Sequence, residues 1–443
     1  MNKQTFITKA LDAGFESFEV YQSIEERRYI EYYEGKMDSY TQSHVLGTSL
    51  RGLYNGKMTT ASTEDSNIED DKIDAFIQMM IDQAAVTTGE DSGLILEPQK
   101  TTLVEKENKF VRPEVKDIEE LLLKIEKKLL SFDERIFQIT QLIYVDNRIV
   151  RSITNSKGND IKDETYNQIV VVGLAAKEND EIKNAYKFEP LYDVKTFDLD
   201  KFVKEAGEEV LNKLGAKSIP SKSYKTIIKR KAMTSLFNAF SQMFSGDLIG
   251  KGISPIKDKL DEQIFSENIT IIDDPRDTKA INIYNYDDEG YPTSKKTLVE
   301  NGKFIKMLHS TKSAMRFNAT STGNGFKSSY NSPIDVSPMN CYIVPGEKSF
   351  DELLNEMNEG LVIEDFQGLH AGIDFASTNF SLQCSGYYVK DGKKDRSVSL
   401  ITAAGNFLEL MKNVEEVGND LEWKFDNILS PSILFKSIAI SGE

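Results

Sequence analysis

The chain has 443 residues, with 54 Lys and Arg against 71 Asp and Glu, so its formal net charge at pH 7 is −17. Its length suits about two or three domains with cores of their own, and 39% of its residues are hydrophobic, which is too many for a disordered chain. An acidic chain has no general attraction for phosphate backbones or anionic lipid, which argues against generic nucleic-acid or membrane-surface binding.

Cysteine content and apolar runs indicate the compartment. Cys341 and Cys384 are the two cysteines and cannot build a disulfide framework, which suits a reducing environment. The N-terminus carries no apolar signal core, and the longest apolar run, residues 169–176, is too short to span a bilayer. We therefore expect a soluble cytoplasmic protein.

The chain opens with a short helical pattern over residues 3–13, closed by Gly14, and then turns to the alternation and β-rich composition of strands. Asn55-Gly56 supplies the positive φ angles of a type I′ turn. This predicts a hairpin in which Leu53 and Met58 face each other, so the N-terminal region begins as a β-meander.

Helices and strands then alternate up to residue 215. Ser66 and Glu69 have the spacing of a capping box, which predicts a helix over 67–86. After a polar connection, apolar residues at helical spacing predict a second helix near 118–129. The following segments read as strands at 135–145, 148–155, 168–175 and 182–188, and as a helix over 198–214 that ends at Gly215.

A polar, proline-containing linker at 216–222 predicts the domain boundary. Beyond it, an apolar stripe that includes Phe237, Phe240 and Phe244 predicts a helix over 231–247, with the stripe in the core rather than in a substrate pocket. Asn301-Gly302 and Asp391-Gly392 predict two further hairpins, and short helices are expected at 351–358 and 404–412.

The fold class expected from these patterns is α+β in two domains. An N-terminal α+β domain, an antiparallel sheet with flanking helices, occupies 1–219. A mainly β C-terminal domain occupies 220–443.

The sequence offers no self-contained active site. Its three histidines, His44, His309 and His370, form no pair on a helical face, which a zinc hydrolase would ordinarily show. Each of the three is therefore expected to be an ordinary hydrogen-bonded residue. No catalytic, cofactor-binding or metal-binding residue is predicted.

One glycine-rich loop is conspicuous. It does not match a P-loop, because no Gly-Lys-Ser/Thr follows, so it is either a turn or a close backbone approach to a peptide or partner. The loop consists of Ser321, Thr322, Gly323, Asn324 and Gly325.

Several short segments, taken in order, resemble the TldD/PmbA family, also labelled modulators of DNA gyrase. Each segment alone is a weak signal, but they occur in the family's order over most of the chain. They are residues 48–53 with 57–63, Ile271-Ile272-Asp273-Asp274-Pro275, Asp288-Glu289-Gly290 with Pro292-Thr293, 298–302, 321–324, Pro345-Gly346, 379–381 with Ser385-Gly386, and 417–421.

The resemblance also indicates which branch of the family this chain represents. TldD-type chains bind zinc through a His-Glu-x-x-x-His helix and a later cysteine, whereas PmbA chains, also called TldE, resemble them in fold but lack these ligands. Here Phe237 and Gln242 stand near the two histidine positions, and no cysteine follows Asn419. One departure is Ser377-Thr378-Asn379, where the family has Thr-Gly-Asp, which leaves the geometry of that loop open.

The resemblance implies a TldE/PmbA-like subunit, without zinc of its own, of a heteromeric metallopeptidase that degrades or matures short unfolded peptides. Zinc is expected in a TldD-like partner subunit. Without that partner, this chain is expected to be inactive and a homodimer is possible. The loop 321–325 is expected to contact the peptide or the partner. The alternative is a stand-alone peptide-binding or regulatory protein, whereas gyrase modulation by direct DNA contact conflicts with the acidic charge.

Overall fold

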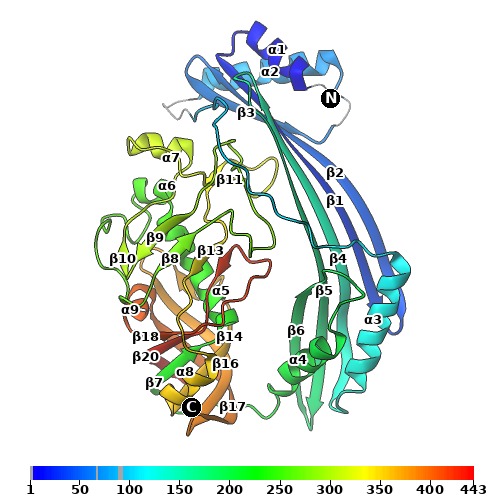
Figure 1. The fold of residues 1–443 in the computed structure, drawn as a ribbon, viewed down its shortest axis with the longest axis vertical. Coiled ribbons are helices and arrows are strands. Elements are labelled where there is room, and N and C mark those ends of the chain that lie inside the picture. The colour runs from blue at the N-terminus through cyan, green and yellow to red at the C-terminus, as the bar shows by residue number, and fades with distance from the viewer. Residues whose placement is uncertain (1–2, 66–67, 88–92) are drawn as a thin grey trace.

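The computed structural model describes residues 3–65, 68–87 and 93–443, and it has a mixed α+β fold in two halves that lie side by side (Figure 1). The N-terminal half is an antiparallel sheet with helices and the C-terminal half is mainly strands, so the predicted fold class is confirmed. None of the helices in these described ranges is long and apolar enough to cross a membrane.

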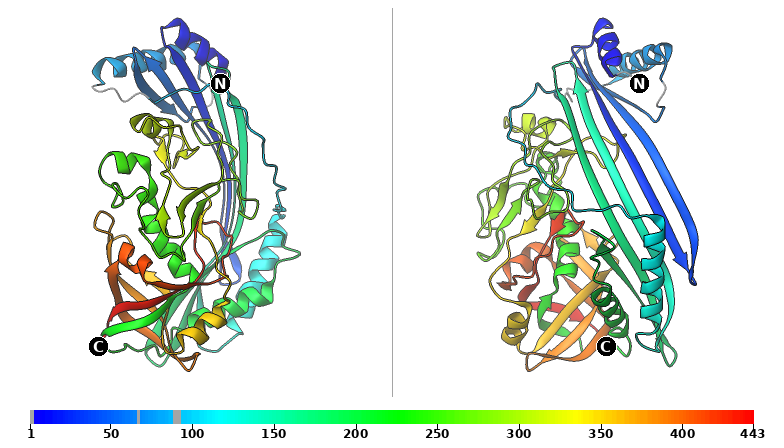
Figure 2. Two further views of the ribbon diagram at one scale, coloured as in Figure 1. Left: turned by 60° about the vertical axis from the view of Figure 1, so that its left-hand side comes forward. Right: turned by 45° about the vertical axis from the view of Figure 1, so that its right-hand side comes forward.

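The N-terminal half is built on one six-stranded antiparallel sheet with the order β3-β2-β1-β4-β5-β6. Four of its strands are long, and they run along almost the whole length of the molecule (Figures 1 and 2). The strands are β1 (Ser17–Tyr33), β2 (Lys36–Tyr54), β3 (Lys57–Thr63), β4 (Ile136–Asn155), β5 (Asp160–Glu178) and β6 (Glu181–Pro190).

Alternation along the strands decides what each face of this sheet contacts. Phe18, Val20 and Leu50 point to the face covered by the helices, where they are buried. Glu19 and Arg51 alternate with them and point to the opposite face, on which the C-terminal half packs. The helices are α1 (Lys3–Asp12), α2 (Asp70–Val86), α3 (Val115–Leu130) and α4 (Leu199–Leu211).

The largest sheet of the C-terminal half closes on itself. Its strands follow the order β14-β7-β20-β17-β16, and β16 pairs back with β14, so five strands form a ring. β15 and β18 extend it at the sides. The strands are β7 (Lys222–Ile228), β14 (Gly360–Gln367), β15 (Ile373–Asp374), β16 (Asn379–Lys390), β17 (Lys393–Asn406), β18 (Val414–Val417) and β20 (Ile433–Ser441).

A second, five-stranded sheet with the order β10-β9-β8-β13-β19 lies above this ring in the view of Figure 1. Its strands, and the separate pair β11-β12, are short and joined by long connections. They are β8 (Ile271–Asp273), β9 (Lys296–Glu300), β10 (Lys303–Phe304), β11 (Gly325–Phe326), β12 (Asp335–Val336), β13 (Cys341–Ile343) and β19 (Ile428–Leu429).

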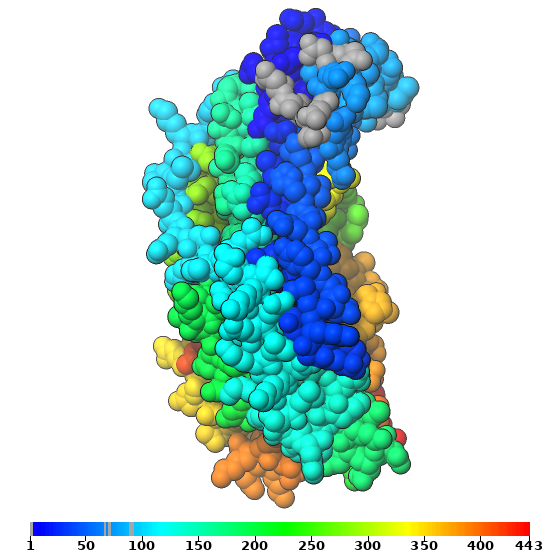
Figure 3. Space-filling view, turned by 90° about the vertical axis from the view of Figure 1, so that its right-hand side faces the viewer, coloured from blue at the N-terminus to red at the C-terminus, as the bar shows by residue number. Residues whose placement is uncertain are grey.

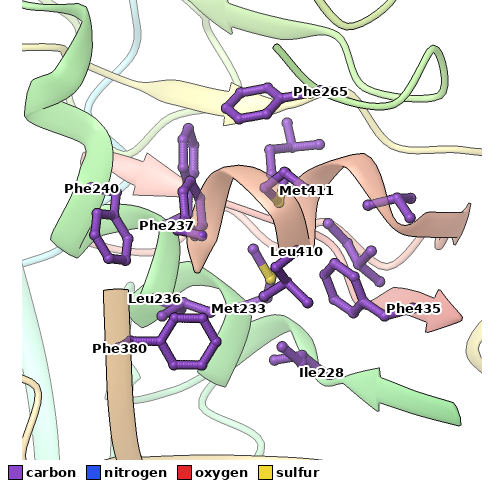
Figure 4. Close-up of a cluster of buried hydrophobic side chains, with 14 of the residues drawn as sticks. Ile228, Met233, Leu236, Phe237, Phe240, Phe265, Phe380, Leu410, Met411 and Phe435 are labelled. Carbon is purple, nitrogen blue, oxygen red and sulfur yellow. The ribbon is translucent and has the colours of Figure 1, made fainter. Parts of the chain in front are cut away.

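The C-terminal core forms where helices bury apolar stripes against these sheets (Figure 4). Phe237 and Phe240 of one helix are fully buried, and the Phe240 ring stacks on Phe407 with centroids 4.5 Å apart. The helical elements are α5 (Arg230–Phe240), the 3-10 turn η1 (Ser241–Phe244), α6 (Gly246–Gly250), α7 (Thr311–Arg316), α8 (Phe350–Met357) and α9 (Phe407–Lys412).

Most predicted elements are confirmed. Leu53 pairs with Met58 across the first hairpin, and the hairpins at Asn301-Gly302 and Asp391-Gly392 both form with positive φ at both residues. Gly215 has the left-handed φ of +67° expected after α4. The predicted helix 67–86 is present as α2, which begins at Asp70, while Ser66 of the expected capping box lies outside the described residues.

Two predictions of how the chain divides into elements were wrong. The helix expected over 231–247 is three separate elements. After α5 the chain narrows to the 3-10 turn η1. Ser245 then begins α6 by accepting a hydrogen bond from the Leu248 amide. The strands expected at 135–145 and 148–155 are one strand, β4, which runs through the polar pair Asp146 and Asn147.

Candidate functional site

The predicted loop, residues 321–325, follows α7, ends in the first residue of β11, and is hydrogen-bonded to the chain just before α7. The Thr322 amide and the Ser321 hydroxyl both donate to the His309 carbonyl oxygen, at 3.1 Å each. The Thr322 hydroxyl in turn accepts from the His309 amide at 2.7 Å. Four of the five loop residues are buried and Thr322 is half-buried, so Thr322 is the most accessible member.

Gly323 is required at its position. Its φ is +70°, and a Cβ built there would lie 2.6 Å from the Pro292 carbonyl oxygen and 2.8 Å from Thr293 Cα. Both contacts are with backbone, which has little freedom to move. The loop is therefore pressed against the chain at 292–293, which is the segment of the Pro-Thr motif.

Asn324 connects the loop to a buried ion pair. Its side-chain amide donates to Asp273 Oδ2 and to the Ser337 carbonyl oxygen, both at 3.0 Å. Lys296 Nζ lies 3.0 Å from the same Asp273 oxygen and donates to the Thr322 carbonyl oxygen at 3.0 Å. Because Asn324, Asp273 and Lys296 are all buried, these contacts hold the loop in one conformation.

Beside the loop, a turn of three acidic residues, Asp287 to Glu289, meets the N-terminal sheet. The buried Glu289 carboxylate accepts from the Thr311 amide at 2.7 Å and the Thr311 hydroxyl at 2.5 Å. Arg51 Nη1 of β2 lies 3.5 Å from Glu289 Oε1, and Arg51 Nη2 lies 2.9 Å from Glu19 Oε1 of β1. Arg51 thus joins two buried carboxylates from the two halves of the chain.

The Asp287 side chain binds backbone amides of the same turn and of the loop. Its carboxylate accepts from the amides of Gly325, Glu289 and Tyr291 at 2.9–3.0 Å. Burial raises its pKa well above the usual value, and the neighbouring Glu289 carboxylate raises that pKa further. The acidic turn and the loop 321–325 are therefore tied together through Gly325.

Asp288 makes a second connection across the two halves. It lies 2.8 Å from Arg151 of β4, which also pairs with Asp163 of β5 at 2.9 Å. The Asp288 carboxylate also accepts from the Lys327 amide at 2.8 Å. Lys327 Nζ then donates to Ser49 Oγ of β2 at 3.0 Å, and burial lowers the pKa of Lys327 to about 8.

We call this set of charged side chains the polar junction. It pairs Arg51 and Arg151 of the long sheet with carboxylates from both halves of the chain, and it holds the loop 321–325 in a fixed position relative to that sheet. Its members are Glu19, Arg51, Arg151, Asp163, Asp287, Asp288, Glu289 and Lys327.

The segment α5–η1, where the resemblance places metal ligands in TldD-type chains, contains no ligand set. Phe237 is fully buried in the apolar core drawn in Figure 4, which it shares with Leu236 and Phe240. Across the described ranges, no three His, Cys, Asp or Glu side chains gather so that they could hold a metal ion. The residues present therefore do not fit a zinc ion at this position.

The two thiols are buried and unpaired, and burial raises the pKa of Cys341 and Cys384, the latter to about 12. Neither is poised as a thiolate nucleophile. His309 is also buried, which lowers its pKa, and its Nδ1 lies 3.2 Å from the Ser313 hydroxyl.

Sequence models of three consecutive domains match this chain. They are described as PmbA/TldA metallopeptidase domain 1, the central domain and the C-terminal domain, and they match residues 18–84, 108–214 and 221–442. The chain belongs to the PmbA/TldD metallopeptidase family. The resemblance drawn from its motifs is therefore confirmed.

Relatives and solved structures agree with this assignment. Metalloprotease MJ0996 of Methanocaldococcus jannaschii is 27% identical over 398 residues, which cover 88% of this chain and 86% of that protein. Metalloprotease PmbA of Escherichia coli O157:H7 is 25% identical over 240 residues, or 54% of this chain and 50% of that protein.

Two solved structures have the same fold over nearly their whole length. A putative modulator of a DNA gyrase from Thermotoga maritima has a TM-score of 0.89 at 28% identity, covering 99% of both chains. TldE from Thermococcus kodakarensis also has a TM-score of 0.89, covering 99% of both chains, at 22% identity.

Proposed function

We propose that this chain is the TldE/PmbA-like subunit, without zinc of its own, of a heteromeric metallopeptidase that degrades or matures short unfolded peptides in the cytoplasm. The observation that carries the proposal is the α5–η1 segment. The chain belongs to the PmbA/TldD metallopeptidase family, but it has the buried phenyl ring of Phe237 where a metal ligand would stand. Because a phenyl ring cannot bind a metal ion, the metal must come from another chain. The natural source is a TldD-like partner subunit.

In this proposal the chain contributes shape and rigidity. The polar junction fixes the C-terminal half against the long sheet, so that a peptide or partner meets a preformed surface. The half-buried Thr322 is the loop residue that we propose for contact with either of them, because its four loop neighbours are buried. A peptide held by main-chain pairing needs no particular side chains, which suits unfolded substrates.

The experiment is co-expression with a paralogue from the same cell that carries His-Glu-x-x-x-His, followed by purification, metal analysis of each chain and cleavage assays on an unstructured peptide. We expect a stable complex with zinc in the paralogue, and cleavage only when both chains are present. A matched control replaces the paralogue's first motif histidine with alanine, which should abolish cleavage and leave the complex intact.

Two outcomes would contradict the proposal. Stoichiometric zinc in this chain alone, together with peptidase activity, would place the catalytic centre here. Failure of the two chains to associate, combined with peptide binding by this chain alone, would favour a stand-alone peptide-binding or regulatory protein.

A further inference from the structure

A small cavity lies between the end of β6 and the first turns of α4, and we call it the β6–α4 cavity. Its volume is about 210 Å³, and its walls include Glu189, Tyr192, Asp193, Phe197, Asp198 and Glu205. Figure 1 shows α4 next to β6, and Figure 3 looks onto the outer face of this half, where α3, in cyan, lies on the sheet. Pockets for whole small molecules usually have about 300–1,000 Å³, so this cavity suits a single side chain.

Aromatic rings form the apolar part of the cavity. The Phe202 ring is buried, and the half-buried Phe197 ring packs against it with centroids 5.4 Å apart. Tyr192 is 40% exposed, and its ring stacks on Phe110 with centroids 4.9 Å apart. Such rings attract a cation through their faces, and they also accept the methylene stem that carries an ammonium or guanidinium group.

Two carboxylates in the cavity wall have no ion-pair partner. Within the described ranges, no Lys, Arg or His lies within ion-pairing distance of Asp193 or Asp198. Each instead accepts one backbone hydrogen bond, Asp193 from the Lys195 amide at 2.9 Å and Asp198 from the Lys201 amide at 3.0 Å. These bonds hold both carboxylates in place and leave their negative charges for a ligand.

The other two carboxylates of the wall already bind ammonium groups of this chain. Lys187 Nζ lies 2.6 Å from Glu205 and 5.9 Å from the centre of the Phe202 ring. Lys424 of the C-terminal half lies 3.1 Å from Glu189. The wall thus binds lysine side chains through a carboxylate and, for Lys187, an aromatic face together.

The spacing of the acidic groups indicates an organic cation and not a metal ion. A divalent metal needs several oxygen ligands around one point. In the part of the chain that the structure describes, no three His, Cys, Asp or Glu side chains gather in this way, which includes the four carboxylates of the cavity. A guanidinium group carries five donors and delocalises its charge, so it can meet separate carboxylates.

We propose that the β6–α4 cavity binds a lysine or arginine side chain of an unfolded peptide, so that this chain selects basic peptides. The charged end of the side chain meets Asp193 and Asp198, and its stem lies along Tyr192 and Phe197. The net charge of −17 favours the approach of cationic peptides over acidic ones. This inference names the class of peptide for the proposed function and rests on that function.

The test is fluorescence anisotropy on the isolated full chain with two labelled glycine-serine peptides, one with several arginines and one with citrulline at the same positions. Citrulline has nearly the shape of arginine and no charge. We expect the arginine peptide to bind at least about tenfold more tightly. Asp193→Asn combined with Asp198→Asn keeps both backbone acceptors, because asparagine makes the same turn and cap contacts, and it should remove that preference.

A matched control separates the cavity from the general charge of the chain. Asp180→Asn combined with Asp258→Asn removes the same charge at exposed positions outside the cavity wall, and it should leave the preference unchanged. Circular dichroism and urea unfolding of every variant establish that the fold is intact.

A cysteine in the wall locates the bound peptide directly, since both native cysteines are buried. Thr196→Cys places a thiol at an exposed position of the wall, where it can exchange with a peptide that carries an activated disulfide beside an arginine. We expect faster labelling by the arginine peptide than by its citrulline counterpart. The same thiol introduced by Asp180→Cys should show no such difference.

Four results would overturn the inference: equal affinity for the two peptides, a preference that the Asp193/Asp198 variant retains, equal labelling of Thr196→Cys by both peptides, or binding of free arginine amide as tight as that of the peptide. The last result would make a small free cation the occupant. If the two-chain complex cleaves peptides without regard to arginine, the inference fails and the proposed function stands. If arginine peptides bind as expected and the complex cleaves none, the proposed function fails instead.

Discussion

Thr378 holds a backbone conformation that suits glycine, and replacing it tests how much that conformation costs. Its φ is +59°, in the left-handed region, and it stands where the resembling family has glycine. A β-branched residue in this region is strained by about 1–2 kcal/mol. Its side chain is also buried, and its hydroxyl has no hydrogen-bond partner among the described residues, which adds about 1–3 kcal/mol.

We expect Thr378→Gly to stabilise the protein. Two effects oppose this gain. The unfolded chain has more conformational freedom with glycine, which lowers stability by about 0.4–1 kcal/mol. Loss of the buried methyl group lowers it by about 0.8 kcal/mol more. The hydrogen bond from the Phe407 amide to the carbonyl oxygen of residue 378, at 2.7 Å, does not involve the side chain and persists. The net expectation is about 1–2 kcal/mol of added stability.

Urea unfolding followed by Trp423 fluorescence measures this change, because Trp423 is the single tryptophan and its ring packs 5.2 Å from that of Tyr342 in the same half as Thr378. Thr378→Ala is the matched control, since it loses the hydroxyl and the methyl group as glycine does and keeps Cβ. Strain relief of about 1–2 kcal/mol, less about 0.4–1 kcal/mol for the freedom of the unfolded glycine chain, should leave the glycine variant about 1 kcal/mol more stable than the alanine variant. If the two variants unfold at the same urea concentration, the backbone at residue 378 is not strained and the reasoning fails.

Three further changes test the junction, the loop and the core. Lys327 has a pKa of about 8 when folded, below the value of 10.5 for a free lysine, so the unfolded chain holds more protons between these values and stability rises with pH there. The free energy of unfolding of wild type relative to Lys327→Met should therefore increase by about 1–2 kcal/mol from about pH 7.5 to about pH 9.5, as measured by urea titrations at each pH. Gly323→Ala should destabilise the chain by about 2–4 kcal/mol, because its Cβ meets backbone at a positive φ, and a thermal melt unchanged from wild type would contradict this packing. Phe237→Ala should cost about 3–5 kcal/mol in the same urea assay and leave the zinc content unchanged, and a stable variant would remove this ring from the core.

Local signals in the sequence predicted the turns well and the ends of long elements poorly. An Asn-Gly pair decides its own backbone conformation, so the hairpin at Asn55 needs no help from the rest of the fold. β4 continues through Asp146, where the sequence indicated a break, because this buried carboxylate accepts a hydrogen bond from Arg28 at 2.8 Å and one from Tyr144 at 2.9 Å. No local pattern indicates that a distant arginine will neutralise an acidic residue inside a strand.

The prediction of one helix over 231–247 was wrong for a different reason. The apolar stripe continues beyond Phe240, so the hydrophobic period does not reveal that the helix axis breaks there. The break comes from hydrogen bonding, as Ser245 begins a new helix by accepting from the Leu248 amide. Hydrophobic periodicity reports which side chains are buried, and it does not report whether one helix buries them.

The polar junction, together with the contact between Asn324 and Asp273, explains why the family motifs were weak individually and strong together. Arg51, Asp273, Glu289 and Asn324 come from four separate motif segments. Arg51 is half-buried and the other three are buried, and each contacts a partner that is distant in sequence. A buried charge is tolerated only when its partner is present, so each segment makes physical sense only with the others. The sequence could therefore supply the members of the junction through a resemblance, whereas their contacts required the fold. A chain that kept Arg51 and lost Glu289 would bury an arginine beside Glu19 alone and would lose the ion pair that ties the long sheet to the Thr311 end of α7.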